Sequence, residues 1–156
     1  MALDQATSLS VGLRIVLGLV AGVVATLAMD LVMARLPEGA TPPRVASGVL
    51  TGQAPDAAPE GVASAVHYVA GGGTGPLFVT LLFLVEGIVG AEVTSYLVTT
   101  AVLFVLMVGF FVGVVLPRPR LVDGRRATVG RDWAISAAAY LVVLVPLVWA
   151  GSGALG

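Results

Sequence analysis

Residues 93–116 read VTSYLVTTAVLFVLMVGFFVGVVL, an apolar stretch without a single charged residue. A helix needs about 20 such residues to cross the hydrocarbon core of a bilayer, and this stretch is long enough. Backbone groups in hydrocarbon must find their hydrogen-bond partners inside the protein, so a long unbroken block favours a helix over a barrel strand. The stretch therefore predicts one transmembrane helix.

Three further apolar blocks flank this stretch, at about residues 11–36, 62–90 and 131–150. Connectors that contain prolines and most of the charged residues separate them, at about 37–61 and 117–130. Each block approaches or exceeds the length of a membrane span. The pattern predicts an all-α membrane protein, built as a four-helix transmembrane bundle.

The composition agrees with this prediction. Hydrophobic residues make up 58% of the chain and charged residues 11%, against about 45–50% and 25% in soluble domains. The net charge of −1 gives no field that would attract nucleic acid. We expect the whole chain, residues 1–156, to form one transmembrane domain of a multi-pass cell-membrane protein, with the lipid bilayer as its partner.

The connectors predict two local features. Five prolines mark residues 37–61 as a water-exposed or interfacial segment, within which Arg44–Thr51 is expected to form one short interfacial helix. In the other connector Pro117 ends the third helix, and Asp123-Gly124 predicts a turn.

Arginine counting predicts the orientation. Seven of the eight basic residues fall on the side of the two long connectors: Arg35, Arg44, Arg118, Arg120, Arg125, Arg126 and Arg131. Only Arg14 falls on the opposite side. Cytoplasmic loops carry the excess of basic residues in membrane proteins, so both connectors should be cytoplasmic. The expected topology is N-out and C-out.

Small and polar residues recur every four positions on the first two helices. They are Gly18, Gly22, Thr26 and Asp30 on the first helix, and His67, Gly71 and Gly75 on the second. Such stripes let two helices pack closely. These two helices run antiparallel, so we expect Asp30 to face His67 within the cytoplasmic quarter of the bilayer. The same alignment pairs the remaining members, Thr26 with Gly71 and Gly22 with Gly75.

Two other glycine patterns also indicate packing. Gly109 and Gly113 form a G-x-x-x-G motif on the third helix, which either packs within the bundle or joins two copies of the protein. The glycine-rich run 71–75 does not have the spacing or the lysine of a phosphate-binding loop. With Pro76 behind it, this run predicts close packing and a bend in the second helix.

The Asp30–His67 pair has three interpretations. It is a protonatable relay or polar binding site, a buried hydrogen bond that fixes the helix register, or no pair at all, with Asp30 bound to Arg35 or Arg44 instead. We expect the register role, because Asp30 and His67 lie near the edge of the membrane.

A possible outer polar cluster combines Arg14, Glu86, Glu92, Thr94 and Ser95. These residues fall near the non-cytoplasmic side, where opposite charges at similar depth can pair. One interpretation is a polar vestibule for a small ligand or cation. The other, which we expect, is a hydrated rim with one salt bridge, because polar rims are common at membrane interfaces.

Signatures of enzymes and cofactors are absent from the sequence. There is no cysteine and only one histidine, and no catalytic Ser–His–acid, H-E-x-x-H or G-x-S-x-G pattern is present. We therefore expect no catalytic residue, no metal site and no cofactor.

The spacing from Gly22 to Asp30, followed by His67-x₃-Gly71-x₃-Gly75, resembles that of small four-helix membrane proteins of archaea and bacteria. The resemblance covers the first two helices. It implies the four-helix fold and the pairing of Asp30 with His67, and no activity. We therefore expect a non-enzymatic protein that works as a homo-oligomer or as an accessory subunit of a membrane assembly. The alternative is a small proton-coupled transporter or channel that uses the Asp–His pair.

Overall fold

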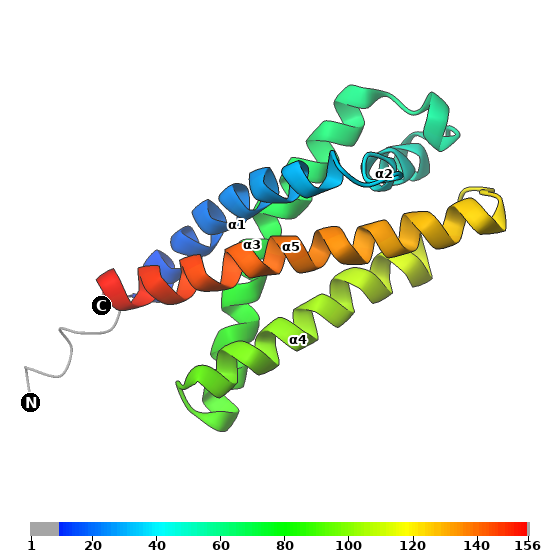
Figure 1. Ribbon diagram of the computed structural model, residues 1–156. Helices are drawn as coiled ribbons and strands as arrows, with labels where there is room; N and C mark the ends of the chain where they lie inside the picture. Colours follow the sequence, from blue (N-terminus) through cyan, green and yellow to red (C-terminus); the bar gives the residue numbers. More distant parts are fainter. Residues whose placement is uncertain (1–9, 156) are drawn as a thin grey trace, which may run out of the picture.

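The computed structural model describes residues 10–155, and every regular element in that range is helical. The elements are α1 (Val11–Met33), α2 (Thr41–Thr51), the short 3₁₀ helix η1 (Pro55–Ala57), α3 (Glu60–Val89), α4 (Val93–Phe110), its π-helical continuation η2 (Phe111–Val115) and α5 (Asp123–Leu155). Figure 1 shows the four long helices with α2 at one end. This end, which carries α2 and residues 116–122, is called the arginine-rich end below.

Four helices are long and apolar enough to cross a membrane: α1, α3, α4 with its continuation η2, and α5. These are the four blocks that the sequence predicts, so the all-α class and the four candidate spans are confirmed. The short helix within the first connector is confirmed as well. It begins at Thr41, three residues earlier than expected, because Pro42 and Pro43 fit the first turn of a helix, where no N–H partner is needed.

One boundary differs clearly from the prediction. The expected turn at Asp123-Gly124 is wrong, because α5 already begins at Asp123 and runs to Leu155. Side-chain contacts across the bundle explain the longer helix. Arg125, in the first turn of α5, donates hydrogen bonds to Glu38 and Asp56, and these bonds hold the turn in place.

The last turn of the third span is π-helical. The Leu116 N–H donates to the Phe111 carbonyl at 2.8 Å, five residues back. On the preceding turn, the Trp133 indole N–H of α5 donates to the Met107 carbonyl at 3.1 Å. The rings of Phe111 and Trp133 lie 4.8 Å apart. A π turn often occurs where a helix serves a specific contact, and here it lies against Trp133.

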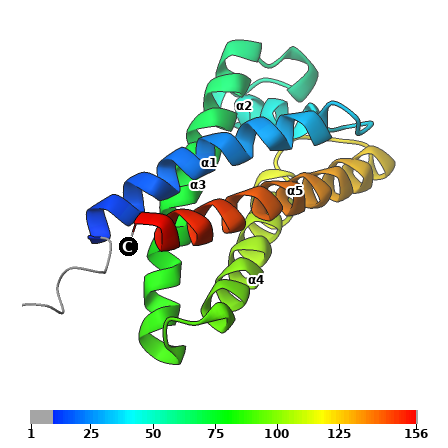
Figure 2. The same ribbon diagram turned by 60° about the vertical axis from the view of Figure 1, so that its left-hand side comes forward.

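The packing of the helices is uneven. α1 packs against α3 and α5, and the C-terminal end of α5 lies beside the start of α1 (Figure 1). The main core lies among α1, α3 and α5, around the fully buried Phe78, Leu82, Tyr140 and Leu144. By contrast, α3 and α4 meet at their tight connection and then diverge (Figure 2). α3 therefore has two different interfaces, a close one with α1 and a more open one with α4.

Candidate functional site

The seam between α1 and α3 is set by glycine. A Cβ built on Gly75 would lie 1.8 Å from the Gly18 carbonyl oxygen, and one on Gly22 would lie 2.9 Å from the Gly72 carbonyl oxygen. Only glycine, which has no Cβ atom, allows the two backbones to approach this closely. The predicted contact of Gly22 with Gly75 is present, since the Gly22 Cα lies 3.1 Å from the Gly75 Cβ position.

Thr26 and Gly71 meet one turn further along the same seam. A Cβ on Gly71 would lie 2.1 Å from the Thr26 hydroxyl oxygen, so this predicted pairing is also confirmed. Thr26 is fully buried and donates its own hydroxyl to the Gly22 carbonyl at 2.8 Å. From the other side, the Tyr140 hydroxyl of α5 donates to the Gly71 carbonyl at 2.6 Å. Hydrogen bonds from Thr26 and Tyr140 to backbone carbonyls thus stabilise the seam.

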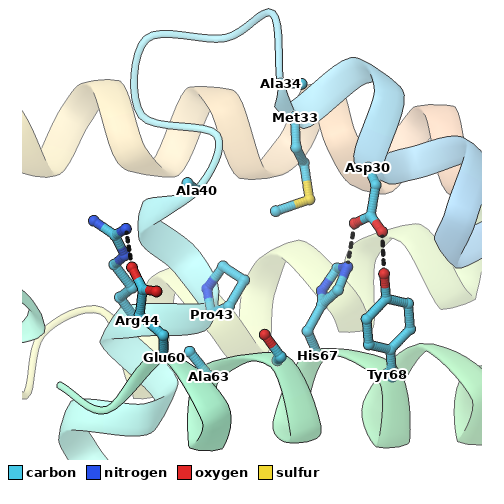
Figure 3. A pocket seen from close by; sticks show the side chains of 11 residues that line it. Asp30, Met33, Ala34, Ala40, Pro43, Arg44, Glu60, Ala63, His67 and Tyr68 are labelled. Carbon is cyan, nitrogen blue, oxygen red and sulfur yellow. Dashed lines mark hydrogen bonds and ion pairs between the residues drawn. The ribbon is translucent and has the colours of Figure 1, made fainter.

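Asp30 lies one turn beyond Thr26 and contacts His67 directly, as predicted. The His67 Nε2 lies 2.7 Å from one carboxylate oxygen, and the Tyr68 hydroxyl donates to the other at 2.7 Å. Figure 3 shows the Asp30 carboxylate between the two rings. The His67 side chain is 10% exposed and that of Asp30 is 33% exposed. His67 and Asp30 are therefore in direct contact at the protein surface, with His67 the more buried of the two.

Tyr68 is the residue that the sequence interpretation missed. It follows His67 directly, and neighbours in a helix project about 100° apart, so the four-residue spacing gives no sign of a shared partner. Asp30 nevertheless bridges the two side chains with its two carboxylate oxygens, and their rings stand edge to face at 5.3 Å.

The alternative in which Asp30 binds an arginine is wrong. Arg35 donates to the Leu31 carbonyl, and Arg44 pairs with Glu60 at 3.0 Å.

Two cavities border this group of residues. The first, of about 340 Å³, lies at the arginine-rich end, and its mixed lining includes Asp30, Arg44, Glu60 and Tyr68. The second, of about 460 Å³, lies between α3 and α4 and is mostly apolar. His67 lines both cavities. The imidazole ring therefore lies between a cavity that has charged lining residues and one that is almost wholly apolar.

The predicted outer cluster is assembled only in part. Arg14 donates two parallel hydrogen bonds to Glu86, each 3.0 Å, and its guanidinium lies 4.5 Å from the centre of the Phe83 ring. Both charged side chains are about 15% exposed, so the salt bridge is more buried than a hydrated rim.

The other members of the cluster do not join this salt bridge. Glu92 and Thr94 are exposed, and the buried Ser95 donates to the Glu92 carbonyl at 2.6 Å. Of the predicted cluster, only Arg14 and Glu86 are therefore in contact through their side chains.

A second polar group, at the arginine-rich end, was not predicted as a unit. Arg125 donates to Glu38 at 3.0 Å and to both oxygens of Asp56 at 2.8 Å. The fully buried Asp132 accepts the Glu38 backbone N–H at 2.8 Å and hydrogen bonds from Arg131. The Arg125 guanidinium lowers the pKa of the Asp56 carboxyl, chiefly through these hydrogen bonds. This group ties the first connector to α5.

Gly109 of α4 and Gly113 of η2 have no packing partner in the described part of the chain. A Cβ built on Gly109 or Gly113 would meet nothing within 4 Å, and both residues are exposed. Packing of this motif inside the bundle, one of the two interpretations of the sequence, is therefore wrong. A contact between two copies remains as the other interpretation.

Comparison with known proteins adds no relative. The chain matches no protein-family model, no curated protein and no solved structure. The resemblance to small four-helix membrane proteins of archaea and bacteria therefore stays a prediction. What the fold and its composition support is a multi-pass protein with four candidate membrane spans.

Proposed function

We propose that the protein is a non-enzymatic four-span membrane protein that works as a homo-oligomer or as an accessory subunit of a larger membrane assembly. The observation that carries the proposal is the contrast between its glycine motifs. The glycines of α1 and α3 lie in close contact, whereas Gly109 of α4 and Gly113 of η2 lie on an exposed face. Small residues spaced by four positions favour helix association in lipid, so this face suits contact with another helix.

The remainder of α4 supports the same proposal. Of the four spans it has the smallest buried share, and its outward stripe continues from the glycines to Val105, which is 66% exposed. Within residues 10–155, its packing partners are mainly α3 and α5. In addition, the described connectors are short and are bound to the bundle, which leaves them no room to form a separate catalytic domain.

Cysteine crosslinking tests this proposal, because the chain contains no native cysteine. A Gly109→Cys variant in membranes should form a disulfide-linked dimer under oxidation if copies meet along α4. Val142→Cys on α5 is the matched control, since Val142 is 72% exposed and lies on another helix. A dimer from both variants would indicate random collision. If neither variant gives a dimer, and a crosslinker recovers no partner from native membranes, the proposal is wrong.

The second function that we propose is proton-coupled transport through the Asp30–His67 pair. The observation that favours it is that both residues line an open cavity. The direct 2.7 Å contact speaks for the register role, because no water separates the two groups. Four helices are also few for a transport path, so this function requires several copies.

Proton flux in liposomes distinguishes the two roles of the pair. Transport predicts a flux that disappears in Asp30→Asn while the variant stays folded. The register role predicts no flux in the parent and lower thermal stability in the variant. Tyr68→Phe is a useful control, because it removes one hydrogen bond to Asp30 and leaves the Asp30–His67 contact in place.

A further inference from the structure

The apolar cavity between α3 and α4 has a single unsatisfied hydrogen-bonding side chain. Four lining side chains carry polar atoms: His67, Thr74, Trp133 and Tyr140. Three of them donate to backbone carbonyls, namely Thr74 to Ala70, Trp133 to Met107 and Tyr140 to Gly71. Only His67 keeps a free ring nitrogen, since Nδ1 has no partner among residues 10–155 and is not sealed inside the protein.

The contacts of Asp30 determine what this nitrogen can bind. Tyr68 donates to one carboxylate oxygen and His67 Nε2 lies 2.7 Å from the other. We assign the ring proton to Nε2, because this tautomer places a donor opposite the carboxylate oxygen. In the neutral imidazole the other nitrogen, Nδ1, then offers a lone pair. A ligand that satisfies the site must therefore donate a hydrogen bond.

The rest of the cavity determines the body of the ligand. Its volume of about 460 Å³ lies in the range of small-molecule sites, and its remaining lining is apolar, with Leu103, Leu106, Phe110 and Phe111 from the third span. Burying a charged group among these apolar side chains would be costly. The ligand is thus a neutral molecule with a large apolar body.

The rim of the cavity indicates where the ligand comes from. Leu106 and Phe110 are 49% and 62% exposed, and Ala70 on the facing helix is exposed as well. On a membrane span, exposed apolar side chains face lipid. A cavity bordered by such residues opens onto the bilayer and is filled from it.

We propose that the cavity between α3 and α4 is a binding site for a lipid-soluble alcohol or phenol, whose hydroxyl donates to His67 Nδ1 while its apolar body fills the cavity. Asp30 acts as a positioning residue, because it holds the ring and its tautomer. The site goes beyond the proposed assembly through α4, since Gly109 and Gly113 are not part of its lining.

Trp133 supplies the readout, because it lines the cavity and the chain has only one other tryptophan. The probe is ω-bromoundecanol, whose bromine quenches tryptophan on contact, and its methyl ether is the same molecule without the donor. Both are titrated into the Trp149→Phe protein in phosphatidylcholine vesicles. One hydrogen bond corresponds to an alcohol half-quenching concentration about fivefold lower than that of the ether.

Two controls separate binding from partition into the bilayer. The Trp133→Phe protein retains Trp149, which is 60% exposed on the lipid-facing surface, and there the alcohol and the ether should quench equally. In the Trp149→Phe background, His67→Phe should abolish the preference for the alcohol. Should that variant not fold, Ala70→Phe replaces it. It fills the cavity without touching the Asp30–His67 pair, and it should weaken quenching by both probes.

A competition experiment determines whether the site prefers an alcohol or a phenol. Dodecanol and an alkylphenol are added to the quenched protein, and the one that restores fluorescence at the lower concentration identifies an aliphatic or a phenolic ligand. Three results would overturn the proposal: equal quenching by alcohol and ether in the parent, a preference that survives in His67→Phe or undiminished quenching in Ala70→Phe, or no recovery with either competitor.

Discussion

The two interfaces of α3 differ in the size of the side chains that form them. Towards α1, glycines bring the backbones so close that a Cβ on Gly75 would lie 1.8 Å from a carbonyl oxygen. Towards α4, leucine and phenylalanine side chains surround a cavity of about 460 Å³. The interface with α1 has no space for an added side-chain atom, whereas the interface with α4 encloses free volume. Close approach therefore fixes the position of Asp30 against His67, and the open side leaves the same histidine accessible.

The largest effect is expected at the closest point of the tight interface. Gly75→Ala should destabilise the fold by about 3 kcal/mol or more, because its Cβ collides with backbone atoms that cannot rotate away. The measurement is SDS-induced unfolding in bicelles, followed by circular dichroism. Gly73→Ala is the matched control, since its Cβ would meet nothing within 4 Å. Equal stability of the two variants would break the comparison.

A smaller effect is expected one turn along, where a side chain provides the obstacle. Gly71→Ala should cost about 1–2 kcal/mol, because its Cβ meets the Thr26 hydroxyl and methyl groups. Removing these groups with Thr26→Ala should make the second substitution less costly. A double-mutant cycle in the same unfolding assay measures this coupling. Strict additivity of the two substitutions would show that they do not meet.

The open interface should tolerate added volume. Ala70→Leu places three more carbon atoms at the wall of the apolar cavity, and we expect its stability to stay within about 1 kcal/mol of the parent. The same unfolding assay checks this. A loss as large as that of Gly75→Ala would mean that α3 and α4 leave no free space.

The smallest effect is expected at the arginine-rich end. Arg125 lowers the pKa of Asp56, so the ionised carboxyl stabilises the folded state at neutral pH. This contribution is lost as the pH falls through the pKa of Asp56 in the folded protein. Thermal melting between neutral and acidic pH should therefore fall less steeply in Asp56→Asn than in the parent. Since Asp56 is exposed, the difference will be small and will shrink at high salt.

Local patterns in the sequence predicted the four spans and the tight interface. Apolar length alone defines a span, because hydrocarbon demands helices of that length. The four-residue spacing from Gly18 to Asp30 and from His67 to Gly75 defines one face of each helix, and two such faces have one close antiparallel alignment. Asp30 and His67 could therefore be paired without a structure.

Tertiary structure decided what depends on distant residues. Tyr68 reaches Asp30 only because of the way α1 crosses α3, and α5 begins early where Arg125 finds Glu38 and Asp56. The cavity depends on the divergence of α3 and α4 (Figure 2), and the spacing of residues along either helix does not predict that divergence. The physical reason is range: a helix and its small-residue face are properties of neighbouring residues, whereas a cavity, a shared carboxylate and a helix start held by ion pairs arise only when separate helices pack.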